Sequence, residues 1–195
     1  RDIHKGLRFD FSKYLLDPNA KALSEGSVYK HLEKIGVNAC DSIYVPNREP
    51  DQIELFPKCV VIDDKEFDWE DDVPINRPLN ESIIYETHLK GYTASSSSGV
   101  SCPGTYKGFI EKIPYLKELG ITAVEFLPLY EFDENENGNI NPKTGERLKN
   151  FWGYSTIGFF APKQSYSSDK TPGGCVREFK QLVKELHKAG IEVIL

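Results

Sequence analysis

The strongest constraint on the fold is an alternation of short apolar runs with amphipathic segments between residues 82 and 195. The runs rich in β-branched, aliphatic and aromatic side chains, which predict strands, are 82–88, 121–127 and 191–195. The segments with apolar side chains at helical spacing are 109–119 and 176–186. This β-α-β-α-β order predicts an α/β fold with a parallel sheet and right-handed crossovers. The run 121–127 is almost continuously apolar, so we expect a strand covered on both faces.

Glycine and proline mark the ends of the two helical segments. Gly120 and Gly190 directly follow them, as expected for residues that end helices. Pro114 lies inside the first segment and predicts a kink or a restart of the helix there. Between Pro128 and about Gly174 we expect one long loop, far longer than the usual connection in an α/β protein.

The part of the chain before residue 80 predicts an irregular connector. A short helix is expected at 27–36, and a short strand at 59–62. Several prolines between them exclude long helices and central strands. Seven of the ten residues in 63–72 are acidic. We expect this acidic segment to be solvated, with Phe67 and Trp69 anchoring it to a neighbouring core.

Charge and composition exclude several function classes. The 24 basic and 30 acidic side chains give a net charge of −6, which would repel a nucleic acid backbone. No apolar run approaches the ~20 residues of a membrane span, and the first residues lack the apolar core of a signal peptide. The four cysteines show no metal-site spacing, which favours reduced thiols in a cytosol-like compartment. These features favour a neutral or cationic ligand.

The long loop carries the clearest candidate for a binding site. Its aromatic side chains cluster in the sequence NFWGYST at 150–156 and again at 159–166. Loops at the carboxyl ends of parallel strands form ligand sites, and aromatic rings can stack on the apolar faces of sugars. Spacing alone leaves a second interpretation open, in which these rings form a small core that folds the loop.

Candidate carboxylates for glycoside hydrolysis are Glu86, Glu125, Glu131 and Asp133. None of them forms a convincing facing pair, and we expect Glu86 and Glu125 to contact a polar core residue such as His88. Residues 133–140 match the first two-thirds of a calcium-binding EF-hand loop, but the twelfth position is Thr144 in place of the bidentate glutamate. A polar turn is therefore expected there, and no metal site is assigned.

Several stretches together resemble one enzyme family. The chain is similar to the start of the catalytic barrel of isoamylase-type glycogen and starch debranching enzymes, in the α-amylase superfamily. The stretches that carry the resemblance are 84–93, 103–106, 116–128, 150–156, 160–162 and 178–194. Residues 6–10 and 13–21 resemble the connector that follows the amino-terminal carbohydrate-binding module of these enzymes.

The resemblance implies a domain organisation. Residues 1–80 would be the connector after a carbohydrate-binding module that lies upstream of this chain. Residues 81–195 would supply the first three strands and two helices of a (β/α)8 barrel, which 195 residues cannot complete. We therefore expect this chain to be a fragment. Its exposed strand edge would favour self-association.

The resemblance also implies retaining hydrolysis of α-1,6 branch linkages in glycogen, amylopectin or limit dextrin. The catalytic aspartate and glutamate would lie beyond residue 195, so no catalytic residue is assigned and the chain alone is expected to be inactive. Tyr154 matches the aromatic residue that stacks under the sugar at the cleavage subsite, and Trp152 would shape the same wall. Retaining hydrolysis of a neutral glucan needs no metal, so no cofactor is expected.

Other functions within and beyond this superfamily remain open from the sequence. The whole protein could be a branching enzyme, a pullulanase or a trehalohydrolase, or a catalytically silent isoamylase-like subunit that binds glucan. The NFWGYST stretch with the later FAP at 160–162 favours the isoamylase type over the related enzymes. It does not separate an active enzyme from a silent subunit. A cytoplasmic location is expected, with the plastid as the alternative.

Overall fold

The computed structural model describes residues 15–24 and 57–195. Its strands are β1 (Ile84–Thr87), β2 (Ala123–Phe126), β3 (Tyr130–Phe132), β4 (Thr156–Pro162) and β5 (Glu192–Ile194). Its α-helices are α3 (Leu89–Thr93), α4 (Tyr106–Ile110), α5 (Ile113–Leu119) and α6 (Gly174–Lys188). The short 3₁₀ helices are Asp64–Glu66, Leu79–Glu81, Ser96–Ser98 and Gln164–Tyr166. The helix expected at 27–36 lies outside the described residues.

The central sheet confirms that the three predicted strands pair in parallel, while the connections between them contain more elements than the β-α-β-α-β prediction has. Its strand order is β1-β2-β5, and both pairs are parallel. In the register of β1 on β2, Glu86 lies opposite Glu125. The carboxyl ends of the three strands therefore lie at one edge of the sheet, where the long segment after β2 begins.

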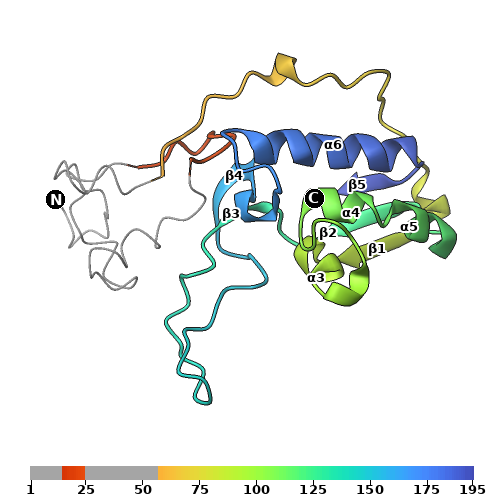
Figure 1. Ribbon diagram of the computed structural model, residues 1–195. Coiled ribbons are helices and arrows are strands. Elements are labelled where there is room, and N and C mark those ends of the chain that lie inside the picture. The colour runs from red at the N-terminus through yellow and green to blue at the C-terminus, as the bar shows by residue number, and fades with distance from the viewer. Residues whose placement is uncertain (1–14, 25–56) are drawn as a thin grey trace.

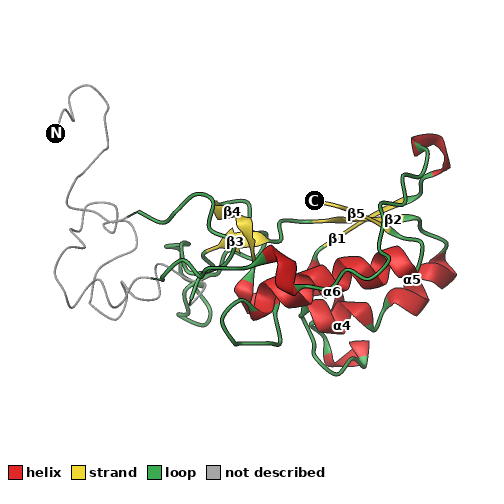
Figure 2. Cartoon of the chain, turned by 90° about the horizontal axis from the view of Figure 1, so that it is seen from above, coloured by secondary structure: helices red, strands yellow, loops and turns green. Residues whose placement is uncertain are grey.

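Helices α4, α5 and α6 cover one face of this sheet (Figure 2). The core between them contains fully buried side chains from each layer, such as Leu116 of α5, Val124 of β2 and Leu186 of α6. Ile84 and Glu86, which share the other face of the sheet, are exposed. The expectation that residues 121–127 are covered on both faces thus holds for the central strand itself, where Ala123 and Val124 are buried, and not for its neighbour β1.

The first crossover consists of three short helices, where the periodicity predicts a single segment. Pro114 occupies the first turn of α5, so the chain stops one helix at Ile110 and starts another, as the restart interpretation predicts. Gly120 ends α5 with φ 82°, a left-handed conformation that favours glycine. Gly190 follows α6 in the same way, with φ 79°.

The segment expected to be one long loop contains a second sheet, and that expectation is corrected here. β3 and β4 pair antiparallel, with register shifts on both sides of Glu131. Residues 133–155, between these strands, form a loop that projects away from the body of the chain (Figure 1). A three-residue strand with an irregular partner carries too little alternation to be detected in the sequence.

The acidic segment 63–72 runs along α6 as a strap (Figure 1). Lys184 of α6 donates to the Asp68 carbonyl and to Glu70, and its ammonium lies 5.1 Å from the centre of the Phe67 ring. Phe67 packs edge-on against Trp69 at 4.8 Å. Phe67 thus lies against lysine side chains of α6, and neither ring belongs to the buried core clusters of the described residues. In place of the strand expected at 59–62, the described residues show a single bridge between Cys59 and Leu23.

Two further observations concern helix hydropathy and the cysteines. Within 15–24 and 57–195, no helix is long and apolar enough to cross a membrane. Cys59, Cys102 and Cys175 are free thiols, as expected, and Cys40 lies outside the described residues.

Candidate functional site

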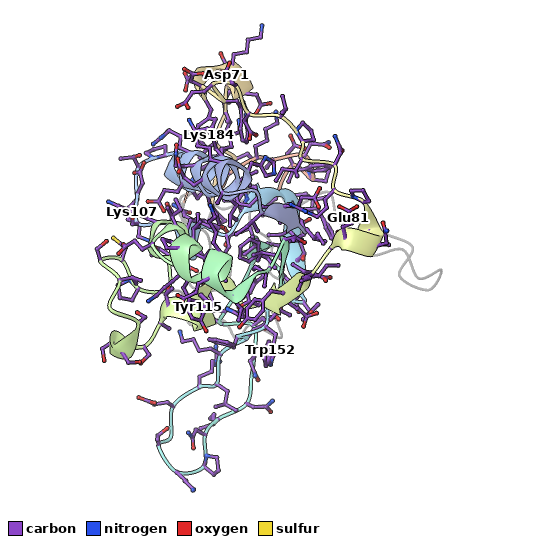
Figure 3. The ribbon with its side chains drawn as sticks, turned by 90° about the vertical axis from the view of Figure 1, so that its right-hand side faces the viewer. Asp71, Glu81, Lys107, Tyr115, Trp152 and Lys184 are labelled. Atoms are coloured by element: carbon purple, nitrogen blue, oxygen red, sulfur yellow. The ribbon has the colours of Figure 1, made fainter. Side chains whose placement is uncertain are left out.

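A groove of about 620 Å³ lies at the base of the projecting loop. Its residues come from both arms of that loop: Glu136, Asn137, Gly138, Lys149, Asn150, Phe151, Trp152, Tyr154 and Ser155. Figure 3 shows Trp152 at the junction between the loop and the body of the chain. The lining therefore combines polar and charged groups with aromatic rings.

Three aromatic side chains form what we call the aromatic wall: Phe151, Trp152 and Tyr154. They are 45%, 58% and 73% exposed, respectively. Tyr166 and Phe132, in contrast, are 2% and 1% exposed and belong to the core. The two interpretations of the aromatic cluster thus apply to different residues, because some rings form a small core while the wall faces solvent. Exposing such area costs free energy unless a ligand covers it.

Gly153 is the residue that allows the wall to form. Its φ is 83°, and a Cβ placed there would lie 2.7 Å from the Phe132 ring. Its N–H donates to Asn150 Oδ1 at 3.0 Å, and the Asn150 N–H donates to the Glu134 carbonyl at 2.8 Å. A left-handed turn tied down in this way holds the backbone between Trp152 and Tyr154 against the core.

The four candidate carboxylates of the sequence analysis lie outside the groove. Glu86 is exposed and Glu125 half-buried, side by side on neighbouring strands. Asp133 is buried and accepts from the Asn135 N–H at 2.7 Å, so it lies in a turn as expected. Among the described residues that line the groove, Glu136 is the single acid.

The expectation that Glu86 and Glu125 contact His88 is wrong. The His88 ring hydrogen-bonds to the Phe151 carbonyl and to the Gly91 N–H. His88 follows the last residue of β1 and caps helix α3, so strand alternation does not hold it beside Glu86, and its ring lies against the aromatic loop. Its partners are backbone groups and aromatic rings rather than carboxylates.

The fourth candidate, Glu131, belongs to a buried ionic cluster under the loop. Lys163 Nζ donates to Glu131 Oε1 at 2.7 Å, to the Phe132 carbonyl at 2.7 Å and to Glu134 Oε2 at 3.0 Å. The Gln164 N–H donates to the other oxygen of Glu131 at 2.9 Å. Lys163 and Glu131 are both almost fully buried. Every donor of the lysine is used, so the cluster holds β3 and β4 together at the root of the loop.

The ionisation of Glu131 gives a testable pH dependence. Burial raises the pKa of Glu131 from 4.5 to about 7, although the Lys163 ammonium and the Gln164 N–H favour the ionised form. A carboxyl group with a raised pKa in the folded state stabilises the fold below its unfolded pKa, and this contribution is lost as the pH rises through about 7. Glu131→Gln removes the titration and keeps the size of the side chain.

We expect the melting temperature of the unmodified protein, relative to that of the Glu131→Gln variant, to fall as the pH is raised from 5 to 8. Differential scanning calorimetry of both proteins at each pH measures this difference. A difference that grows with pH would show that the ion pair with Lys163 outweighs burial and holds the pKa below its usual value.

The EF-hand-like segment forms a series of polar turns. Asp133, Asn137 and Asn141 each accept a hydrogen bond from the backbone N–H two residues later. In the described ranges no group of three histidine, cysteine, aspartate or glutamate side chains is placed to hold a metal ion. Within the EF-hand-like segment, Asp133 and Asn137 are thus used by the backbone of the loop, and the Asn135 oxygen accepts from Lys149.

Sequence reasoning identified the aromatic residues of the groove and missed the charged residues Glu136 and Lys149. Glu136 and Lys149 reach the groove because the two arms of the loop pair, through a bridge between Ile140 and Arg147. The Asn150 side chain donates to Glu136 across the arms. The sequence contains no local pattern for this pairing.

Comparisons with known proteins identify the family of this chain. A family model described as the α-amylase catalytic domain matches residues 67–195. Isoamylase 1 of Arabidopsis thaliana, a chloroplastic protein, is 42% identical over 194 residues, which are 98% of this chain and 23% of that protein. The glycogen debranching enzyme of Serratia proteamaculans is 39% identical over 206 residues, with 100% of this chain and 28% of that protein covered. The chain thus spans about a quarter of the curated relatives that it matches.

Two solved structures share the arrangement of the described elements. The catalytic module of a multi-modular glycogen-degrading pneumococcal virulence factor, SpuA, aligns with a TM-score of 0.65 at 27% identity, covering 93% of this chain and 25% of that one. A type I pullulanase from Bacillus subtilis, solved with maltose, aligns with a TM-score of 0.61 at 27% identity, covering 91% of this chain and 22% of that one.

Proposed function

This chain belongs to the α-amylase family, and on that basis we propose that it is part of a debranching hydrolase that cleaves α-1,6-glucosidic linkages in α-glucan. The curated relatives support this reaction, because those with about 40% identity are named isoamylases and glycogen debranching enzymes. We further propose that 81–195 is the amino-terminal part of a (β/α)8 barrel, with 1–80 as the connector before it. The barrel would then be completed by other parts of the whole protein.

The observation that carries the proposal is the aromatic wall at the carboxyl-terminal edge of a parallel sheet. Sugar rings present apolar C–H faces that stack on aromatic side chains, while hydroxyl groups at the ring edges need hydrogen-bond partners. The groove offers both, because Trp152 and Tyr154 line it together with Glu136, Lys149 and Asn150. A neutral glucan also suits a chain with a net charge of −6, which disfavours polyanionic ligands.

In this proposal the chain binds and orients the substrate, and the reacting carboxylates belong to the rest of the barrel. A retaining glycosidase needs a nucleophile and an acid/base about 5–5.5 Å apart, facing each other across the scissile bond. Tyr154 would lie under the ring at the cleavage subsite, and Trp152 would extend the same surface. Stacking becomes more favourable as the ring flattens and gains positive charge, so the wall would stabilise the transition state more than the bound substrate.

The linkage that is cut distinguishes this function from the alternatives. We expect the whole protein to release reducing ends from amylopectin and glycogen as linear chains, and to leave linear amylose uncut. Chromatography of the released chains and their iodine absorption measure this directly. Faster cleavage of pullulan than of glycogen would indicate a pullulanase, and new branches without new reducing ends would indicate a branching enzyme. Release of trehalose from a trehalose-terminated oligosaccharide would indicate a trehalohydrolase, and glucan binding without any reaction a silent subunit.

The proposed cellular location follows the relatives. They include a chloroplastic plant isoamylase and a bacterial debranching enzyme. We propose a cytoplasmic location, with the plastid as the alternative. No cofactor is part of the proposal, because the reaction proceeds through carboxyl groups alone.

A further inference from the structure

His88 lies behind the aromatic wall and contacts it through its ring plane and through Nε2. The ring is stacked on Phe151, with centroids 4.3 Å apart and planes 15° apart, and it packs edge-on against Trp152 at 6.2 Å. The residue is only 8% exposed. A substrate lying on the outer side of the wall would therefore not touch His88.

The hydrogen bonds of His88 fix its tautomer. Nδ1 accepts from the Gly91 N–H at 3.0 Å, so this nitrogen carries no proton. Nε2 lies 2.8 Å from the Phe151 carbonyl, which can only accept, so Nε2–H donates to it; the Tyr166 hydroxyl lies farther from Nε2, at 3.4 Å. One nitrogen thus caps helix α3 at its first turn, and the other holds the loop that bears Trp152 and Tyr154.

We propose that His88 is a positioning residue for the glucan-binding wall, acting through its bond to the Phe151 carbonyl. The expected effect on catalysis rests on the proposed function. The expected effect on the order of the loop rests on the geometry alone. The wall is tied at two points, by Asn150 to Gly153 and by His88 to Phe151. Loss of the second tie frees the backbone next to Trp152 while leaving the turn at Gly153 in place.

The two roles of the imidazole can be separated by two amide side chains. In His88→Asn, the shorter amide places its oxygen near the position of Nδ1, where it still caps α3, but it cannot reach the Phe151 carbonyl. In His88→Gln, the longer amide places its nitrogen near the position of Nε2 and can donate to that carbonyl. His187→Asn is the matched control, because His187 lies on α6, pairs with Asp72 of the acidic segment and does not line the groove.

The test uses the whole protein and two readouts. In His88→Asn we expect faster hydrogen exchange in the peptide 150–155, with exchange in α6 unchanged, and a fall in kcat/KM on amylopectin of roughly 10- to 100-fold, mainly in kcat. In His88→Gln we expect the slow exchange of 150–155 and most of kcat/KM to be restored. In His187→Asn we expect both quantities to stay unchanged. A third variant, His88→Ala, removes both hydrogen bonds of the ring. The proposal would be overturned if exchange were unchanged in His88→Asn, or if His88→Gln lost as much kcat/KM as His88→Ala. Faster exchange throughout the chain in all three His88 variants would also overturn it, because the residue would then be a general stabiliser of the fold.

Failure of the proposed function gives a different result. If the unmodified protein released nothing from branched glucan, the exchange of 150–155 would still decide whether His88 holds the wall. The exchange pattern is measured without substrate and does not depend on which reaction the protein catalyses.

Discussion

Tyr154→Ala in the whole protein is expected to lower kcat/KM on amylopectin by roughly 30- to 1000-fold, equivalent to about 2–4 kcal/mol of transition-state stabilisation. Tyr154 is 73% exposed, so its ring contributes little to the core and its removal leaves no cavity. The loss should fall mainly on kcat, because stacking matters most when the sugar ring is flattened. We expect the melting temperature to change little.

Two matched variants show whether the ring face is responsible. Tyr154→Phe keeps the face and should cost much less than Tyr154→Ala. Phe159→Ala removes a ring that is 65% exposed on β4 and does not line the groove, so it should leave kcat/KM unchanged. Equal and small effects from Tyr154→Ala and Tyr154→Phe would assign this tyrosine to the packing of the loop.

The parallel sheet could be predicted because its signals are local. The apolar runs and helical spacings each lie within a dozen residues, and Gly120 and Gly190 end α5 and α6 where the periodicity stops. Even the interruption at Pro114 could be located, since proline at the start of a helix has a fixed consequence. An element could be predicted where the residues of one segment determine its structure.

The β3–β4 sheet and the exposure of the aromatic residues could not be predicted, because they depend on contacts between residues far apart in the sequence. Tyr154 and Tyr166 lie in the same long segment, yet one is exposed and the other buried, because the second packs against Tyr106 and Phe132. Lys163 follows a proline and would ordinarily be solvated, and its burial depends on Glu131 from a strand 32 residues earlier. Such pairings are set by the three-dimensional arrangement and leave no periodic pattern.

The second large effect concerns the 195-residue chain by itself, which we expect to release no reducing ends from branched glucan. The groove has a stacking surface but one acid, Glu136, among its described residues. Glu86 and Glu125 are neighbours in register, but they lie side by side on the sheet and do not face each other across the groove. A retaining reaction needs facing carboxyl groups, so substrate would bind without being cut.

The physical state of the purified chain has to be known for this experiment. Within the described part, β5 pairs with β2 along one edge only, and Phe160 and Leu195 are exposed near it. We expect the chain to self-associate through this surface, and light scattering at micromolar concentration reports the mass of the species. The activity is then assigned to a defined particle.

The most direct test of the central claim is a side-by-side assay of reducing ends from amylopectin, with the whole protein and the 195-residue chain at equal molar concentration. The claim is that this chain supplies the glucan-binding wall and that other parts of the protein supply the reacting carboxylates. The account predicts release by the whole protein, strong loss on Tyr154→Ala, and no release by the chain alone. A rate that copurifies with the chain and disappears in Glu86→Ala or Asp133→Ala would contradict it, because the reacting carboxylates would then lie within these residues.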